Sequence, residues 1–378
     1  MFGTGGTALV AKTYGEGNQK KANEYFSLLT IVASVIALGL AAIGIIFMPQ
    51  IATLLKAEDE LLKNCVSYGR IILVALPFFV LQVMFQSFFV AAEKPHLGLI
   101  VTVISGETNM ALDALLVLLL PQDLKLIGAA IATATAQIVG GVIPLIYFLS
   151  KNSNILRLGK TKFDGKAVLQ ACTNGSSEFM TNISMSIVDI LYNLQLMHYA
   201  GENGLAAYGV MMYVSMIFNA VFVGYSIGVA PVIGYHDGAK NCAELKGLLR
   251  KSLVLIAIFG VGMIILGELL ADPLSRFFVG YDKELYDLTL SGFRIFALCF
   301  GFMGFGIFAS GFFTALNDGL TSAIIAFVRT LIFQSAAVML LPIFLDINGV
   351  WLSVVVAEFM SLILGFGFLA IKKKKYHY

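Results

Sequence analysis

The feature that most constrains this chain is a series of apolar blocks, each long enough to cross a lipid bilayer as a helix. About 20 apolar residues in helical conformation span the hydrocarbon core. Backbone polar groups in lipid must be satisfied internally, and the alternation typical of a membrane β-barrel is absent, so we predict helices. The ten predicted spans are 26–48, 67–92, 97–120, 126–149, 167–199, 205–233, 252–271, 288–314, 320–343 and 349–370.

Composition excludes several other classes of protein. Of the 378 residues, 58% are hydrophobic and only 13% are charged, whereas a soluble domain carries about a quarter charged residues. A soluble enzyme, a disordered chain and a nucleic-acid-binding protein are therefore not expected. The four cysteines are scattered and form neither a disulfide framework nor a C-x-x-C metal motif. A G-x-S-x-G pattern at 224–228 lies inside a predicted helix, so it is not the strand-to-helix nucleophile turn of a hydrolase, and we expect no enzymatic activity.

The charged residues indicate how the chain is oriented. Most of the 25 lysines and arginines fall in one set of alternate connections between spans, which includes the segment 150–166 and the tail 372–378. Because cytoplasmic loops carry the excess of lysine and arginine, we expect both segments to lie in the cytoplasm and the protein to lie in the cell membrane. The KKKK run of the tail fits a stop-transfer anchor more simply than it fits recognition of a particular lipid.

The chain also contains an internal repeat. Tyr14–Asn18 precedes a basic segment and an apolar span, and so does Asp237–Asn241, 223 residues later. Arg70 corresponds to Arg294 (294 − 70 = 224), the segment 91–95 corresponds to 315–319 at the same spacing, and Gly128 corresponds to Gly349 (349 − 128 = 221). The spacing predicts two pseudo-symmetric six-helix lobes that enter the membrane from the same side, a parallel repeat.

The repeat sets the expected domain boundaries. We predict an N-lobe over 1–149, a basic cytoplasmic linker over 150–166, a C-lobe over 167–371 and a basic tail over 372–378. Applying the repeat backwards from residue 167 places the start of the first lobe about 56 residues before Met1. The expectation is therefore an N-terminally truncated form or a misplaced start codon, so that the first lobe lacks its first helix and most of its second; the alternative is a real ten-helix protein.

Ionisable residues inside spans are costly, about 2.5–3.5 kcal/mol at the bilayer centre, and are candidates for function. Glu107, Asn109 and Asp113 form one group in mid-span, with Asn109 and Asp113 four residues apart on one helical face. A carboxylate whose pKa is raised by burial can take up and release a proton, which suits proton coupling. The alternative is a structural ion pair, for example between Glu107 and Arg329.

A second polar group follows one helical face of the predicted span 167–199. It consists of Glu178, Asn182, Asp189 and Asn193. Carboxylate and amide oxygens in such a stripe could bind Na⁺ or a cationic substrate, or could instead form hydrogen bonds between helices. Glu268 and Glu358 are interpreted as solvated residues near the membrane interface. Pro77 and Pro231, which interrupt helical spans, are candidate gating hinges.

Several of these segments resemble one family of membrane transporters. GTGGTALVAKTYGEGNQKKANEYF and GVAPVIGYHDGAKNCAELK are similar to the paired signature segments of the multidrug and toxic compound extrusion (MATE) family. NMALDALLVLLL resembles the N-x-x-L-D pattern of that family's fifth helix, and GENGLAAYGV resembles the segment that opens its eighth helix. The resemblance covers essentially the whole chain.

The resemblance implies a secondary antiporter that exports amphipathic or cationic drugs in exchange for H⁺ or Na⁺, by alternating access of the two lobes. It implies no cofactor besides the coupling ion, organic cations and membrane lipid as partners, and a monomer. The predicted span 288–314, which corresponds to the tenth of the family's twelve helices, contains no Asp or Glu, so the choice between H⁺ and Na⁺ stays open. Two alternatives also stay open: a lipid-linked saccharide flippase of the same superfamily, and a truncated remnant without transport activity.

Overall fold

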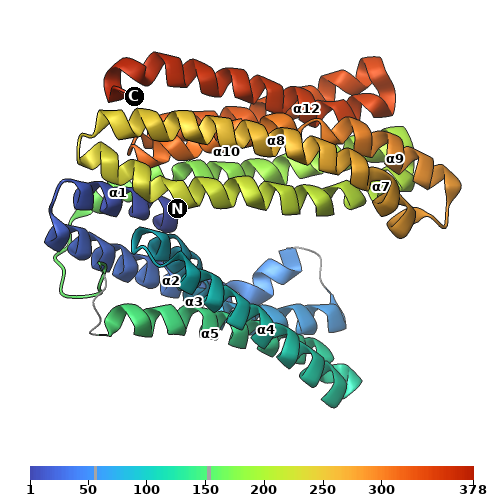
Figure 1. Ribbon diagram of the computed structural model, residues 1–378. Coiled ribbons are helices and arrows are strands. Elements are labelled where there is room, and N and C mark those ends of the chain that lie inside the picture. The colour runs from blue at the N-terminus through green and yellow to red at the C-terminus, as the bar shows by residue number, and fades with distance from the viewer. Residues whose placement is uncertain (55–57, 151–154) are drawn as a thin grey trace. The chain divides into compact units, whose positions relative to one another are not determined.

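The computed structural model describes residues 1–54, 58–150 and 155–378, and within these ranges every regular element is helical (Figure 1). Lys56 and Lys151, which contribute to the predicted charge bias, lie outside the described residues. The elements are α1 (Phe2–Gly15), α2 (Gln19–Leu54), α3 (Asp59–Ala91), α4 (Pro95–Leu119), the short 3₁₀ turn η1 (Gln122–Leu124), α5 (Lys125–Leu149), α6 (Gly165–Asn174), α7 (Ser176–Gly238), α8 (Cys242–Val279), α9 (Lys283–Ala297), α10 (Phe300–Ala315), α11 (Gly319–Phe327), the π-helical segment η2 (Val328–Phe333) and α12 (Gln334–Tyr376).

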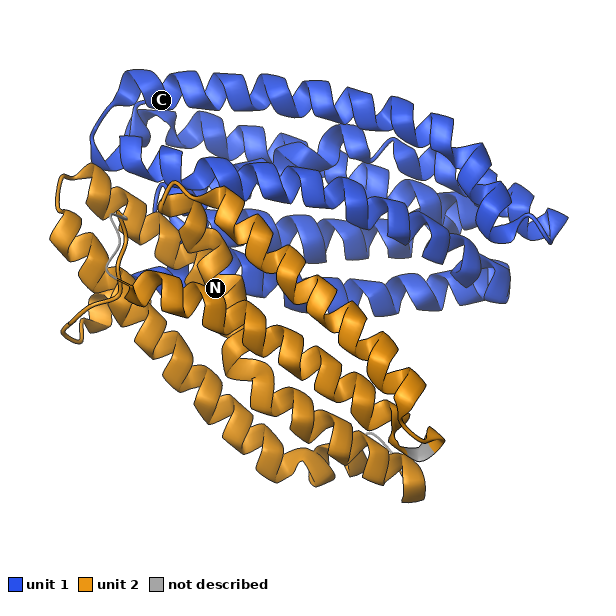
Figure 2. Ribbon diagram, turned by 60° about the horizontal axis from the view of Figure 1, so that its bottom comes forward, with its two compact units in different colours: residues 1, 170–378 blue, residues 2–169 orange. Residues whose placement is uncertain are grey.

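The chain divides into two compact units (Figure 2). Unit 2 comprises residues 2–169, and unit 1 comprises residue 1 together with residues 170–378, so that the boundary lies inside α6. In unit 2, α3 packs on α2 and α5, while α4 packs on α5. In unit 1, α10 is the central helix and packs on α7, α8, α11 and α12.

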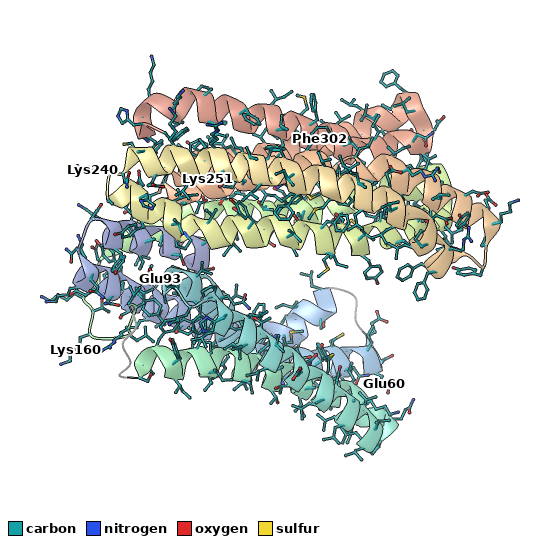
Figure 3. All side chains as sticks on the ribbon, viewed as in Figure 1. Glu60, Glu93, Lys160, Lys240, Lys251 and Phe302 are labelled. Atoms are coloured by element: carbon teal, nitrogen blue, oxygen red, sulfur yellow. The ribbon has the colours of Figure 1, made fainter. Side chains whose placement is uncertain are left out.

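The prediction of a multi-pass, all-helical membrane protein is confirmed. Among the described residues, seven helices are long and apolar enough to cross a membrane, or up to eight if α9 and α10 form one bent span. Large apolar side chains stand outward from many helices (Figure 3), including Leu118, which is 83% exposed, and Phe344, which is 80% exposed. Such a surface would be unstable in water and suits a hydrocarbon environment.

Two of the longest helices contain breaks that separate predicted spans. Within α7, Gly201 adopts a non-helical conformation (φ 59°, ψ −147°) between the predicted spans 167–199 and 205–233. Within α12, Asp346 does the same (φ 48°, ψ −136°) before the last predicted span. Each of these long helices is therefore two helical segments joined at a sharp local bend.

The prediction of one continuous helix over 288–314 is wrong, because α9 and α10 meet at a bend of 46°. The backbone tightens there, since Leu298 N–H donates to Ile295 O and Cys299 N–H donates to Phe296 O, each three residues back. This 3₁₀ hydrogen-bond pattern replaces the α-helical one and redirects the axis. The predicted span 167–199 is also divided, between α6 and α7 at Gly175.

The internal repeat has a counterpart in the turns of the two units. Gly17 and Lys240, 223 residues apart, both have positive φ (82° and 54°), and so do Glu93 and Asn317, 224 residues apart (both 59°). The hydrogen bonds repeat as well: Asn18 N–H donates to Thr13 O as Asn241 N–H donates to His236 O. These are helix ends of the Schellman type. Corresponding helices thus terminate in the same way in both units.

Unit 2 is held by an aromatic cluster and by a close contact between two helices. Phe26 of α2 packs on Phe88 of α3 and on Phe148 of α5, with ring centroids 4.7 and 5.0 Å apart. Nearby, Gly141 of α5 approaches the backbone of α3 so closely that a Cβ atom there would collide with Phe78 O and lie 2.8 Å from Phe78 Cα. The helices α3 and α5 therefore meet backbone to backbone at this point.

Candidate functional site

A line of polar side chains joins α4 to α5 in unit 2. Ser105 Oγ donates a hydrogen bond to Ala136 O at 2.8 Å, and one turn further Asn109 Nδ2 donates to Thr133 Oγ1 at 3.3 Å. Asp113 occupies the next turn of the same face of α4, and its side chain is half-buried. Its Oδ1 atom is buried and has no hydrogen-bond partner within the described ranges. The spacing of four residues therefore places Asn109 and Asp113 on one face, as predicted.

Glu107 does not belong to this line. Its side chain is exposed, whereas Asn109 and Asp113 are half-buried. Residues two apart on a helix point in nearly opposite directions, which explains the separation. The predicted group of three is thus a pair, Asn109 and Asp113, with Glu107 elsewhere on the helix surface.

The stripe on α7 is a single exposed face. Glu178, Asn182, Asp189 and Asn193 are all exposed, and Asn182 Nδ2 donates to the backbone oxygen of Glu178 at 2.7 Å. An adjacent face of the same helix is buried in unit 1 through Ser184, Val188 and Tyr192. The four side chains are therefore free of the core of unit 1 and are accessible to an ion or to a small molecule.

Glu358, the most buried charged side chain among the described residues of unit 1, forms an ion pair that joins α12 to η2. Arg329 Nη2 donates to Glu358 Oε1 at 2.8 Å, and Arg329 Nε donates to Oε2 at 2.9 Å. The exposed fractions of the two side chains are 14% for Arg329 and 1% for Glu358. The interpretation of Glu358 as a solvated interface residue is therefore wrong, and the partner of Arg329 is Glu358 rather than Glu107.

One signal in the sequence could have identified this pair. The last predicted span contains a single acid, Glu358, and the preceding one contains a single base, Arg329. A buried charge in a membrane span is paired with a charge of opposite sign wherever possible. By contrast, Glu268 behaves as expected: it is 41% exposed and lies 3.8 Å from the exposed Arg294.

The backbone around the buried ion pair is adapted to it. Arg329 lies in a π-helical segment, and such segments are inserted turns that are frequent at functional sites. Gly306 of α10 leaves room for the pair, because a Cβ atom there would collide with Ser361 Oγ and lie 2.9 Å from Arg329 Cδ. Ser361 Oγ is buried and accepts or donates no hydrogen bond within the described part of the chain.

The basic tail is docked at the start of α11 through Asp318. Lys372 Nζ lies 3.1 Å from Asp318 Oδ2, and the Tyr376 hydroxyl donates to the same oxygen at 2.8 Å. Asp318 Oδ1 also accepts from the backbone N–H of Thr321 and so caps α11. Burial alone would raise the pKa of the Asp318 carboxyl, but the hydrogen bonds from Tyr376, Thr321 and Lys372 outweigh it and lower that pKa to about 2.

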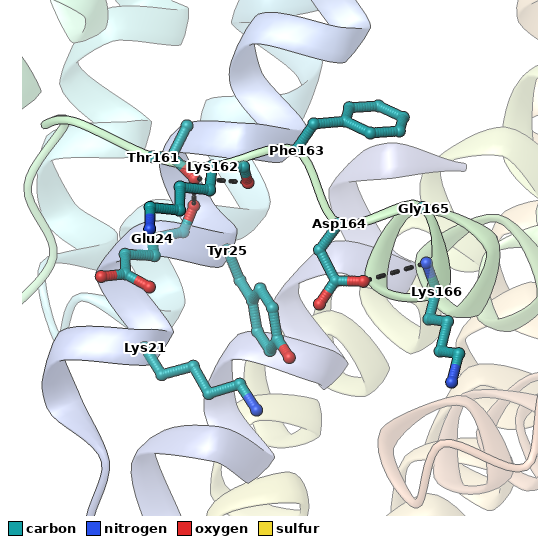
Figure 4. Close-up of a pocket in the computed structure, with 9 residues that line it drawn as sticks. All are labelled: Lys21, Glu24, Tyr25, Thr161, Lys162, Phe163, Asp164, Gly165 and Lys166. Atoms are coloured by element: carbon teal, nitrogen blue, oxygen red, sulfur yellow. Dashed lines mark hydrogen bonds between the residues drawn. The ribbon is translucent and has the colours of Figure 1, made fainter.

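Unit 2 also has a pocket at the start of α2, with a cavity volume of about 590 Å³ (Figure 4). The residues that line it are Lys21, Glu24, Tyr25, Thr161, Lys162, Phe163, Asp164, Gly165 and Lys166. From the sequence, the segment 150–166 was predicted to be a basic linker between the lobes, and no binding site was expected there. Folding of the linker onto α2, which brings its lysines together with Lys21, is a tertiary feature with no local signal.

The backbone is helical at both candidate hinge prolines. Helix α3 runs through Pro77, which is buried, and α7 runs through Pro231, which is also buried. The non-helical breaks in the long helices are at Gly201 and Asp346 instead. A gating role for Pro77 and Pro231 stays a prediction.

The fold and these intramembrane polar groups define a class: a multi-pass helical membrane protein of the kind that moves solutes. The MatE family model matches residues 1–115 and 179–338. The chain belongs to this family of efflux transporters, and the resemblance seen in its signature segments is confirmed.

Relatives and solved structures agree with that assignment. The multidrug export protein MepA of Staphylococcus haemolyticus (strain JCSC1435) is 27% identical over 364 residues, covering 95% of this chain and 78% of that protein. MepA of Staphylococcus aureus (strain MSSA476) is 25% identical over 362 residues, with the same two coverages. A crystal structure of MATE in complex with MaL6 has a TM-score of 0.93 at 17% identity and covers all of this chain and 84% of that one. A MOP superfamily transporter from Pyrococcus furiosus has a TM-score of 0.91 at 17% identity, again over 100% and 84% of the two chains.

Proposed function

We propose that this protein exports amphipathic or cationic organic compounds from the cell in exchange for H⁺ or Na⁺, by alternating access of its two units. Family membership supports efflux, and the name of the MepA relatives supports drugs as the class of substrate. The positive-inside bias supports a cytoplasmic location for the linker 150–166 and the tail 372–378.

The observation that carries the proposal is the carboxyl group of Asp113. It lies within a membrane span, is half-buried, and has an oxygen atom with no hydrogen-bond partner among the described residues. A carboxylate left in this state is costly in a low-dielectric environment, and uptake of a proton removes the charge. Asn109 lies one turn away and is held by its hydrogen bond to Thr133, so a polar side chain lies beside Asp113. We assign the coupling proton to Asp113.

The exposed stripe on α7 is the proposed contact surface for the transported compound. Asp189 supplies negative charge, and Asn182 and Asn193 supply amide groups along the same face, while Glu178 lies 3.9 Å from the N-terminal ammonium group of Met1. A cationic substrate gains charge-assisted hydrogen bonds from such a surface. The same oxygen ligands suit Na⁺, which keeps Na⁺ as the second candidate for the coupling ion.

A lipid-linked saccharide flippase is the weaker proposal. Such a transporter needs cationic side chains free to hold phosphate groups in the membrane. Of the two arginines within the predicted spans of unit 1, Arg329 is bonded to Glu358 and Arg294 lies 3.8 Å from Glu268. Both charges are therefore already compensated by carboxylates of the same unit, which favours an organic cation as the substrate.

Transport in proteoliposomes tests the assignment of Asp113. A pH gradient and a Na⁺ gradient are imposed in turn, and efflux of a fluorescent cationic dye is measured. We expect Asp113→Asn to abolish the acceleration of efflux by the pH gradient, because the amide cannot take up a proton. Glu107→Gln is the matched control, since it removes one carboxylate from an exposed position on the same helix.

Two results would contradict the proposal. If the Asp113→Asn variant still shows efflux driven by the pH gradient at the wild-type rate, Asp113 is excluded as the coupling group. Dye efflux that responds to neither gradient in the wild-type protein would contradict ion-coupled export by this chain and would favour a remnant without activity.

A further inference from the structure

We propose that the pocket between the start of α2 and the linker binds the phosphate of an anionic phospholipid headgroup at the cytoplasmic face of the membrane. Three lysines line this pocket: Lys21 from α2, and Lys162 and Lys166 from the linker and the start of α6. All three side chains are exposed, so their ammonium groups are accessible (Figure 4). The inference goes beyond transport and uses only the proposed cytoplasmic location of the linker.

The charge balance of the pocket favours an anion. Its lining contains three lysines and two acids, Glu24 and Asp164. Asp164 is already engaged, because its Oδ1 atom accepts hydrogen bonds from the backbone N–H groups of Lys166 and Ala167 at 3.0 and 3.2 Å. Both carboxylates keep their charge, so the formal net charge of the lining is +1 (3 − 2).

The pocket is held in shape by hydrogen bonds between the linker and α2. The Thr161 hydroxyl donates to Glu24 O at 2.9 Å, Gly159 N–H donates to Ser27 Oγ at 2.9 Å, and Arg157 N–H donates to Asn23 Oδ1 at 2.8 Å. On the α2 side, Lys21 Nζ lies 5.4 Å from the centre of the Tyr25 ring. Preformed sites of this kind lose less conformational entropy when a ligand binds.

The surroundings favour a lipid over free phosphate. Phe163, which also lines the pocket, is 79% exposed, and phenylalanine together with lysines is typical of segments that lie at the membrane interface. Along α2, the face that carries Glu24 continues through exposed Ile31, Val35 and Leu38, at spacings of seven, four and three residues. This apolar face begins where the pocket ends and provides a surface for acyl chains.

Native mass spectrometry of the purified full chain tests the proposal. The protein is delipidated in detergent and titrated with phosphatidylglycerol or phosphatidylcholine, and retained lipid is counted. The test variant is the triple substitution Lys21→Gln, Lys162→Gln, Lys166→Gln. The matched control is Lys240→Gln, Lys246→Gln, Lys251→Gln, which removes three exposed lysines from unit 1.

We expect the test variant to bind phosphatidylglycerol at least about tenfold more weakly than the wild type, because it loses the attraction of three lysines to the anionic headgroup. The control should bind as the wild type does. Inorganic phosphate at about 10 mM should not displace the lipid. Equal losses in both triple variants would overturn the proposal in favour of general surface charge. Retention of phosphatidylcholine as strong as that of phosphatidylglycerol would overturn the anionic preference, and displacement by inorganic phosphate would assign the pocket to free phosphate. Lipid retention is measured without transport. Failure of the efflux assay would therefore count against the proposed function and not against this lipid site.

Discussion

Each of the two units holds a carboxylate inside a membrane span, and these two carboxylates have opposite hydrogen-bond environments. In unit 1, Glu358 is 1% exposed and receives hydrogen bonds from Arg329 at 2.8 and 2.9 Å. In unit 2, Asp113 is half-buried and one of its oxygens has no partner within the described residues. Glu358 is therefore held by a partner of opposite charge, whereas the buried oxygen of Asp113 has no hydrogen-bond partner among the described residues, and this difference is why we propose Asp113 as the coupling group.

The largest effect on stability is expected at the compensated carboxylate. Glu358→Gln leaves the guanidinium of Arg329 buried without a counter-charge, and such a loss costs about 3–5 kcal/mol. Thermal unfolding of the purified protein in detergent measures it. Glu268→Gln is the control, because its ion pair is exposed and contributes about 1 kcal/mol or less. If both variants unfold at the same temperature, the buried pair is not a major source of stability.

The second effect concerns the space around that pair. Gly306→Ala places a methyl group against Ser361 and Arg329, and overpacking of this kind costs about 1–3 kcal/mol. Gly367→Ala, in α12, meets nothing within 4 Å and should leave stability unchanged or raise it, since alanine is the better helix former. The same unfolding experiment compares the two. Equal behaviour of the two alanine variants would mean that the helices around Arg329 can separate at little cost.

A smaller, pH-dependent effect is expected at Asp318. Its carboxyl pKa is lowered to about 2 from a model-peptide value of 3.8, so its contribution is complete above about pH 4 and is lost as the pH falls towards 2. Asp318→Asn should therefore lower stability by about 1 kcal/mol at neutral pH and by less near pH 2. Unfolding temperatures of both proteins between pH 7 and pH 2 test the sign: a gap that widens on acidification would contradict it.

The smallest effect on stability is expected at the uncompensated carboxylate, although its effect on transport should be large. Asp113→Asn removes a charge whose Oδ1 atom has no hydrogen-bond partner among the described residues and keeps the shape of the side chain, so the free energy of unfolding should change by less than about 1 kcal/mol. This variant sharpens the comparison with Glu358→Gln, which replaces the same group in the other unit. A loss as large as that of Glu358→Gln would mean that Asp113 is also a structural charge.

Hydrophobic pattern and helical spacing predicted much of this from the sequence. The span predicted at 126–149 corresponds to α5 (Lys125–Leu149), and the spacing of Asn109 and Asp113 placed them on one face. The pairing of Arg329 with Glu358 was missed, because 29 residues separate them and a pattern along one helix does not show which helix lies against it. The bend between α9 and α10 was missed for a related reason: hydropathy reports the length of an apolar block and is insensitive to its hydrogen-bond pattern.

The backbone contact between α3 and α5 has a mechanical consequence for unit 2. Packed helices slide past each other by small shifts in an intervening layer of side chains. At Gly141 there is no such layer, since the α5 backbone lies directly against Phe78, the residue that follows Pro77 in α3. The two helices are in direct backbone contact beside the proline. Any rotation of the part of α3 beyond Pro77 would therefore move α5 with it as one rigid body.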